Sequence, residues 1–268
     1  MNNPIENRTN SAHEPIFTSA TGTTTDSTAA AAPAPFDGAR NRERIRRAMT
    51  AYFVLGPQDV EPLGRTVLDA VKQALAGGIT FLQLRAKPGD AGDILELARQ
   101  ISAILPQGEP GIDRPYFVID DRVDVAWAAR QEGLKVDGVH VGQTDLPVRH
   151  VRALLGDDAV IGLSTGSVAE AQAAAPLADI IDYVGIGPYH DTISKADAPD
   201  GLGAERFAAV SRAARPLPNC AIGGVTPEDA PQIAANGGDG LCVISFICRA
   251  PSIEHAAYEL RSAWENAR

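Results

Sequence analysis

The sequence predicts an α/β protein of the (β/α)₈ or TIM-barrel class, preceded by a disordered N-terminal extension. Eight short apolar runs recur between residues 52 and 245, and each ends on polar residues or glycine. Segments with apolar residues at three- and four-residue spacing, which is typical of helices, separate these runs. Barrel strands are buried on both faces, so they read as continuous apolar stretches. An open doubly wound sheet also fits the alternation, but eight regular units over about 200 residues favour a closed barrel.

The same two patterns predict the individual elements in chain order. Runs rich in β-branched, Leu and aromatic residues predict strands at Tyr52–Leu55, Phe81–Arg85, Tyr116–Asp121, Gly138–Val141, Val160–Thr165, Ile181–Gly187, Asn219–Gly224 and Leu241–Ser245. Amphipathic spacing predicts helices at Thr66–Ala76, Asp90–Leu105, Val123–Gln131, Pro147–Leu155, Ser167–Ala175, Ala204–Ala214, Pro227–Ala235 and Ser252–Trp264. Glycine is favoured just past a helix end, and it stands there at Gly77, Gly156 and Gly237.

Residues 1–38 are predicted to be a disordered low-complexity tail, and residues 39–268 the barrel domain. The tail is rich in Thr, Ala, Asn, Ser and Pro and shows no helix or strand period, so it cannot bury enough surface to offset ordering entropy. It lacks the basic start and apolar core of a secretory signal. No stretch approaches the ~20 apolar residues that cross a bilayer. We therefore expect a cytoplasmic protein without a membrane partner.

The charges argue against a nucleic-acid partner. Five arginines cluster before the first strand, at Arg40, Arg42, Arg44, Arg46 and Arg47, but no aromatic residues lie among them and the chain carries a net charge of −10. A solvated helix is the better interpretation of the cluster. The cysteines Cys220, Cys242 and Cys248 lack metal-type spacing and are expected to be small buried side chains. His140, inside the fourth run, is expected to be a hydrogen-bonded core residue. The oligomeric state stays open.

An anion site is predicted after the second strand. In an extended segment, alternate side chains point the same way, and these are Gln83, Arg85 and Lys87. One amide and two cations on one side can bind an anionic group. A surface salt bridge is the alternative for Arg85 taken alone.

A Mg²⁺ site is predicted at the ends of the third and fourth strands. Asp120 and Asp121 end the third run, and Asp145 follows the fourth. Carboxylates at neighbouring strand ends can converge on one ion, and Mg²⁺ prefers one or two carboxylates plus phosphate oxygens. The alternative is that Asp121 and Asp145 cap the helices that follow them.

The later strand ends offer hydroxyl, ammonium and glycine groups. No His or acid adjoins Ser164 in the sequence, so we interpret it as a binding group and not a nucleophile. The loop after the sixth run places two hydroxyls and an ammonium together, at Thr192, Ser194 and Lys195. Gly224 and Ser245 stand where many barrels hold a phosphate through backbone N–H groups. We therefore expect two anion pockets and small phosphorylated substrates.

From about Ala51 onward the chain resembles thiamine-phosphate synthase. The blocks that carry the resemblance are Gln83–Lys87, Asp121–Asp124, Gly138–Asp145, Gly162–Thr165, Asp182–Pro188, Thr192–Lys195, Ala221–Thr226 and Ile244–Ser245. Any one block is weak, but eight in order at the expected barrel positions are specific.

The resemblance implies a transferase that joins 4-amino-2-methyl-5-hydroxymethylpyrimidine diphosphate to 4-methyl-5-(2-phosphoethyl)thiazole, or its carboxylate, by a dissociative Mg²⁺-assisted route. Thiamine phosphate and diphosphate are the implied products. Implied contacts to the pyrimidine diphosphate come from Gln83, Arg85, Lys87, Asp120, Ser164 and Lys195, with Asp121 and Asp145 on Mg²⁺. Implied contacts to the thiazole phosphate come from Thr192, Ser194, Gly224, Ile244 and Ser245. The implied catalytic residues are Arg85, Lys87, Ser164 and Lys195, which stabilise the departing diphosphate without a protein nucleophile.

Two departures and two alternatives remain. Family members commonly have Asn in place of Asp120, and an acid there adds negative charge beside the diphosphate. The Pro-Thr-x-Thr-Lys loop of the family appears here as Asp191–Lys195. The related thiazole tautomerase, an isomerase, carries a catalytic His where this chain has Gly166. A non-catalytic protein that binds thiamine precursors is the second alternative.

Overall fold

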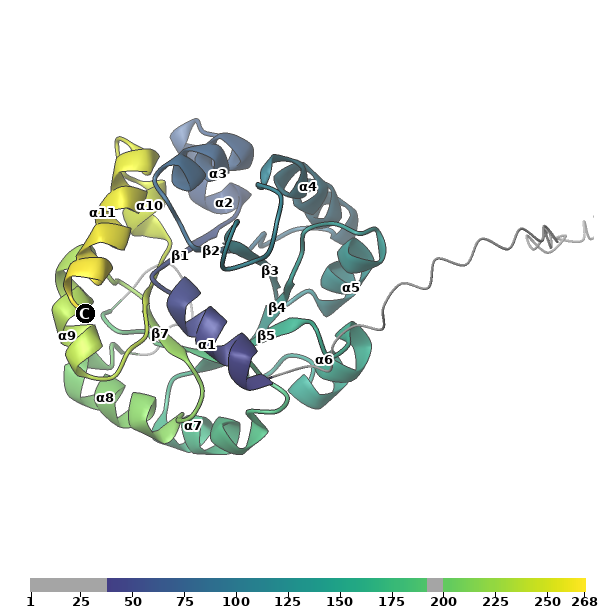
Figure 1. Cartoon of the computed structure of the whole chain (residues 1–268). Coiled ribbons are helices and arrows are strands. Elements are labelled where there is room, and N and C mark those ends of the chain that lie inside the picture. Colours follow the sequence, from purple (N-terminus) through teal and green to yellow (C-terminus); the bar gives the residue numbers. More distant parts are fainter. Residues whose placement is uncertain (1–37, 192–199) are drawn as a thin grey trace, which may run out of the picture. The chain divides into compact units, whose positions relative to one another are not determined.

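Eight parallel strands close into one barrel in the computed structural model, with helices around the outside (Figure 1). The structure describes residues 38–191 and 200–268. Each strand pairs with the next along the chain, and the last pairs with the first. The strands are β1 (Ala51–Leu55), β2 (Phe81–Leu84), β3 (Tyr116–Asp120), β4 (Gly138–Val141), β5 (Val160–Thr165), β6 (Tyr183–Ile186), β7 (Asn219–Ile222) and β8 (Leu241–Val243). The predicted barrel is confirmed.

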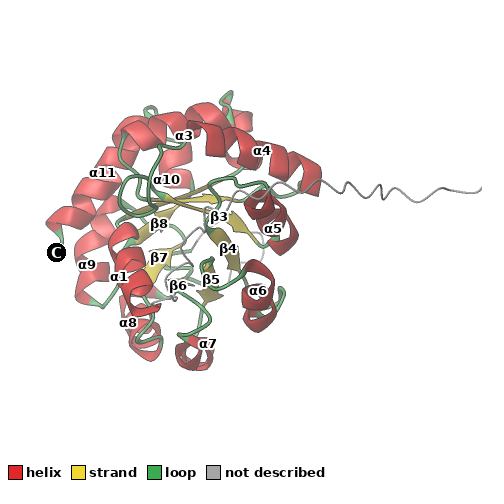
Figure 2. Cartoon of the chain, turned by 45° about the vertical axis from the view of Figure 1, so that its right-hand side comes forward, coloured by secondary structure: helices red, strands yellow, loops and turns green. Residues whose placement is uncertain are grey.

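The helices predicted between the strands form close to their expected ends and surround the sheet (Figure 2). They are α3 (Val67–Ala76), α4 (Ala91–Ile104), α5 (Val123–Gln131), α6 (Val148–Leu155), α7 (Val168–Ala174), α8 (Gly203–Ala213), α9 (Ala230–Ala235) and α11 (Ile253–Asn266). The described residues also form α1 (Gly38–Ala48), α2 (Pro57–Val60), α10 (Ser245–Cys248) and three 3₁₀ turns, at Glu61–Leu63, Ala175–Leu177 and Pro227–Asp229. Within 38–191 and 200–268, none of the helices combines the length and apolar character that crossing a bilayer requires.

The last two strands end earlier than predicted because the backbone turns at their carboxyl ends. Gly223 and Gly224, expected in β7, have φ values of 94° and 68°, which are left-handed and incompatible with a strand. Ser245, expected in β8, begins α10, in which the N–H of Cys248 donates to the carbonyl of Ile244 at 3.0 Å. Both strand ends therefore present loop and helix backbone, and not sheet, to the carboxyl face of the barrel.

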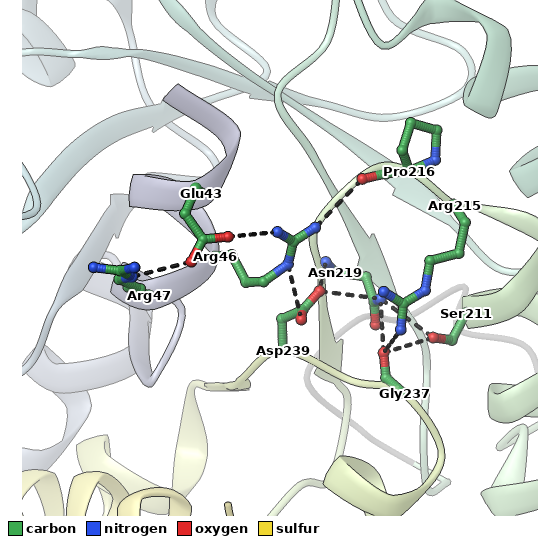
Figure 3. Close-up of polar contacts among 9 residues, drawn as sticks. All are labelled: Glu43, Arg46, Arg47, Ser211, Arg215, Pro216, Asn219, Gly237 and Asp239. Carbon is green, nitrogen blue, oxygen red and sulfur yellow. Dashed lines mark hydrogen bonds and ion pairs between the residues drawn. The ribbon is translucent and has the colours of Figure 1, made fainter. Parts of the chain in front are cut away.

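Helix α1 packs across the amino-terminal end of the barrel, so the predicted helix is present but only one face of it is solvated. Figure 1 shows α1 lying over the middle of the ring of strands. Ile45 is fully buried on its inner face. Arg46 reaches Asp239, just before β8, with Nε 3.2 Å from Oδ1, and also pairs with Glu43 (Figure 3). Asn41 donates to Asp182 at 2.7 Å. Arg46, one of the five clustered arginines, therefore helps to hold the helix to the barrel.

One hydrogen-bonded ring recurs at the amino-terminal ends of four strand pairs. In each ring, a residue just before an even-numbered strand donates its N–H to the carbonyl of a residue in the preceding odd-numbered strand. The N–H of this strand residue donates in return to the side chain of the first residue. The rings join Thr80 to Ala51, Asp137 to Phe117, Asp182 to Ile161 and Asp239 to Asn219. Each of the three aspartates also faces an arginine, namely Arg114, Arg152 or Arg46. These rings satisfy backbone groups that the sheet ladder leaves open, on the face opposite the expected site.

Candidate active site

The carboxyl ends of the strands surround a small cavity of about 30 Å³. Its lining includes five residues that the sequence predicts as substrate contacts, namely Gln83, Arg85, Asp120, Ser164 and Ile244. They lie in or directly after β2, β3, β5 and β8. Barrel closure therefore brings residues from distant parts of the chain to one place.

Arg85, Lys87 and Asp120 form a charged cluster at one edge of this cavity. The Nε of Arg85 and the Nζ of Lys87 each lie 3.5 Å from Oδ2 of Asp120. Burial would lower the pKa of Lys87, but its hydrogen bond to Asp121 and the charge of Asp120 outweigh burial and raise this pKa. The buried Nε of Arg85 has no hydrogen-bond partner among the described residues. The cluster can therefore offer a donor and two positive charges to an anionic ligand.

Asp121 and Asp145 bring two carboxylates into contact beside Lys87. Lys87 donates to Asp121, and Asp145 lies close enough to Asp121 for each carboxyl to shift the pKa of the other. Burial and the charge of Asp121 both raise the pKa of Asp145. Together they outweigh the hydrogen bond from the Gly142 N–H, which lowers it. Burial also acts to raise the pKa of Asp121, but the hydrogen bond and charge of Lys87 outweigh it and lower this pKa. The pKa values of the two carboxyls are thus shifted in opposite directions, and Asp145 is the easier of the two to protonate.

The backbone at Asp121 supports a special role for this residue. Its φ of 57° is left-handed, the single case among the described non-glycine residues. Such conformations cost energy and cluster at functional sites. The capping alternative does not describe either acid: α5 begins after Arg122 without a side-chain cap, and Asp145 accepts from Gly142 at 2.7 Å.

The donor set of Asp121 and Asp145 fits a hard divalent ion. Two adjacent carboxylates are what Mg²⁺ takes from a protein when substrate oxygens complete its shell. Over residues 38–191 and 200–268, no group of three or more His, Cys, Asp or Glu side chains is placed to hold a metal. A metal at this site would therefore need oxygens from a ligand as well.

Ser164 has a histidine neighbour that the sequence does not reveal. The interpretation of Ser164 as a binding group assumed no adjacent His, yet its Oγ lies 3.0 Å from Nε2 of His140 on the neighbouring strand. The other ring nitrogen of His140 lies 3.0 Å from the hydroxyl of Tyr183. This is not the Ser-His-acid arrangement that activates a nucleophile. Ser164 therefore keeps its interpretation as a binding group.

The second expected anion pocket is partly described. Gly224, Ile244 and Ser245 lie together at the ends of β7 and β8, where α10 begins. A Cβ added to Gly224 would stand 2.8 Å from the Cβ of His190, so the backbone approaches its neighbour closely here. Thr192, Ser194 and Lys195 lie outside the described residues. The segment that carries them begins after Asp191, whose carboxylate accepts the N–H of Gly201 at 2.8 Å.

Comparison with known proteins decides the family. A family model described as thiamine monophosphate synthase matches residues 51–247. The chain belongs to the thiamine-phosphate synthase family. It is 41% identical over 196 residues to thiamine-phosphate synthase of Corynebacterium efficiens, covering 73% of this chain and 86% of that protein. It is also 41% identical over 207 residues to thiamine-phosphate synthase of Azorhizobium caulinodans, covering 76% and 90%. The expected enzyme class, a transferase, is confirmed.

Solved structures agree with this family assignment. Thiamine phosphate pyrophosphorylase from Pyrococcus furiosus superposes with a TM-score of 0.69 at 27% identity, over 83% of this chain and 98% of that chain. A 3-hexulose-6-phosphate synthase superposes with a TM-score of 0.56 at 16% identity, over 80% and 99%, which shows the fold alone.

In this member of the thiamine-phosphate synthase family, several cavity residues were not among the predicted site residues. Besides His140 they include Tyr52, Gly185, Cys220 and Cys242. Each lies in a continuous apolar run, where the sequence pattern reads as core. Alternation along the strands is the signal that could have found Tyr52. Tyr52 pairs with Phe81 across β1 and β2, and Phe81 stands two positions before Gln83, so the three side chains are expected on one side of the sheet.

Proposed function

We propose that this chain joins the pyrimidine diphosphate to the thiazole phosphate and releases thiamine phosphate and diphosphate. The observation that carries the proposal is the meeting of Arg85 and Lys87 with the Asp121–Asp145 pair at one edge of the cavity. Two cations beside a two-carboxylate site are what a diphosphate with a bound divalent ion requires. Membership of the thiamine-phosphate synthase family supports the choice of substrates.

Asp121 and Asp145 are the residues that would hold Mg²⁺. When bound there, Mg²⁺ supplies positive charge to diphosphate oxygens. Lys87 already contacts Asp121, so its ammonium lies at the same site and would add a second positive charge there. The protein contributes the position of both acids, and it holds Asp121 in a left-handed backbone conformation.

The chemistry proposed for the residues is dissociative. Cleavage of the C–O bond leaves a pyrimidine-methyl cation and diphosphate, and the thiazole nitrogen captures the cation. Arg85 and Lys87 stabilise the growing charge of the leaving diphosphate, together with Lys195 from the segment outside the described residues. Gln83 and Ser164 orient the pyrimidine diphosphate, while Gly224, Ile244 and Ser245 hold the thiazole phosphate in line. No protein nucleophile takes part.

A diphosphate-release assay tests this function. We expect purified full-length protein to release diphosphate only when both substrates and Mg²⁺ are present, with one thiamine phosphate formed per diphosphate. Isomerisation of a thiazole carboxylate phosphate alone would support the tautomerase alternative. Saturable binding of either substrate without turnover would support the non-catalytic alternative.

Asp120 is expected to weaken substrate binding. Its carboxylate lies 3.5 Å from both Arg85 and Lys87 and cancels part of their positive charge. We expect Asp120→Asn to lower the KM for the pyrimidine diphosphate about fivefold, which corresponds to ~1 kcal/mol for one charge at close range under water-like screening. Steady-state kinetics at low salt measures the change, with Asp124→Asn as the control. A higher KM would show instead that the charge of Asp120 is needed to position the two cations.

A further inference from the structure

A chain of hydrogen bonds crosses the inside of the barrel at the cavity. It runs from Nε2 of Gln83 to the hydroxyl of Tyr52 (2.7 Å), on to the hydroxyl of Tyr183 (2.8 Å) and to Nδ1 of His140 (3.0 Å). Nε2 of His140 then reaches Oγ of Ser164 at 3.0 Å. The two ends, Gln83 and Ser164, are both expected substrate contacts, and both line the cavity.

The middle of this chain is closed to solvent, so its protons must be shared internally. Tyr52 and Tyr183 are 1% and 0% exposed. Burial raises the pKa of both tyrosines well above the usual range, so each phenol keeps its proton. A phenol has one proton to donate, and an unpaired buried donor is costly. The direction of one hydrogen bond therefore fixes the direction of the next one along the chain.

For a neutral imidazole, the chain can run in only two directions. If Gln83 donates to Tyr52, then Tyr52 donates to Tyr183, Tyr183 donates to Nδ1 of His140, and Nε2–H donates to Ser164. The proton of Ser164 is then available to a ligand, and Gln83 keeps its carbonyl oxygen for a ligand. The reverse direction requires the Gln83 amide to be turned so that Oε1, and not Nε2, faces Tyr52, because an amide nitrogen cannot accept a hydrogen bond. Ser164 then donates to His140 and offers a ligand only lone pairs, while Gln83 offers N–H groups.

We propose that Tyr52, Tyr183 and His140 are positioning residues that make Ser164 a hydrogen-bond donor and Gln83 an acceptor at the two ends of one chain. The proposal rests on the proposed function, because a diphosphate oxygen needs a donor and the amino group of the pyrimidine needs an acceptor. Only the first direction serves both groups at once. The buried chain thus selects a substrate with an amino group at one end and an anion at the other.

The direction of the chain is measured by the tautomer of His140, without any substrate. Full-length protein labelled with ¹⁵N-histidine is examined by NMR at neutral pH, and His140→Gln identifies the resonances of His140 among those of the five histidines. We expect a protonated Nε2 and an unprotonated Nδ1. A proton on Nδ1, alone or together with one on Nε2, overturns the proposal.

Kinetics of Tyr183→Phe test whether the chain acts on catalysis. This variant removes the hydroxyl that donates to Nδ1 of His140. We expect kcat to fall about ten- to hundredfold, as for loss of the hydrogen bond from Ser164 to a charged diphosphate oxygen. The KM for the thiazole phosphate should not change, because none of its expected contacts belongs to the chain. In the Ser164→Ala background, Tyr183→Phe should lower kcat by much less than in the wild-type protein, since only its effect through Gln83 remains. If Ser164→Ala and Tyr183→Phe lower kcat independently, so that their separate factors multiply in the double variant, the proposal is overturned.

Tyr116→Phe is the matched control. Tyr116 stacks on Phe81 in the same aromatic cluster, with ring centroids 5.3 Å apart, but its hydroxyl is not part of the chain. We expect wild-type kcat and a wild-type His140 spectrum from this variant. If Tyr183→Phe fails to fold, the wild-type tautomer still decides the proposal. If wild-type protein shows no turnover while His140 carries its proton on Nε2, the proposed function fails and the direction of the chain stands.

Discussion

Asp121→Asn is expected to reduce turnover at saturating substrates by about 10²–10³, the range for removing one group that stabilises charge in a transition state. The substitution is chosen to change charge and little else. Asn has the shape of Asp and tolerates the left-handed backbone found at this position, whereas Ala would strain it. Loss of one carboxylate from the Asp121–Asp145 pair should also raise the Mg²⁺ concentration needed for half-maximal turnover at least tenfold.

Initial rates of diphosphate release over a series of Mg²⁺ concentrations measure both effects. Asp124→Asn is the matched control, because this acid lies shortly after Asp121, in the first turn of α5, but is exposed and pairs with Arg122 at 2.6 Å. The control should retain wild-type rates. A wild-type Mg²⁺ requirement in Asp121→Asn would contradict the assignment of this carboxylate to the metal.

Asp182→Ala is expected to lower the free energy of unfolding by about 3–5 kcal/mol, the range for removing one partner of a buried ion pair. The carboxylate of Asp182 accepts from the Ile161 N–H at 2.8 Å, from Asn41 at 2.7 Å and from Arg152 at 2.9 Å. Its removal leaves the Ile161 donor buried without this acceptor. It also loosens α1 from the end of the barrel.

Urea unfolding followed by circular dichroism measures this loss. Asp158→Ala provides the control, because Asp158 also pairs with an arginine, Arg130, but its side chain is 83% exposed. Exposed pairs contribute about 0–1 kcal/mol, so this variant should be nearly as stable as wild type. Equal losses in the two variants would mean that the ring at the base of β5 and β6 does not stabilise the barrel.

Part of the candidate site could be predicted because it follows from local geometry. Alternation in an extended segment sends Gln83 and Arg85 to the same side, and both line the cavity. The acids at the ends of the third and fourth strands could be expected to meet because neighbouring parallel strands end at one edge. The pairing of Ser164 with His140 could not be predicted, since it depends on which residues face each other across two strands.

The sequence by itself determined the fold class and the order of its eight strands and surrounding helices. Continuous apolar runs, helical spacing and glycine at helix ends are local sequence patterns, so they can be recognised without knowing how the chain folds. Only the tertiary structure decided that α1 packs on the barrel and that Tyr52 meets Tyr183, a residue 131 positions away. The physical reason is closure: contacts inside a barrel depend on the register and tilt of all its strands together, and no single segment encodes them.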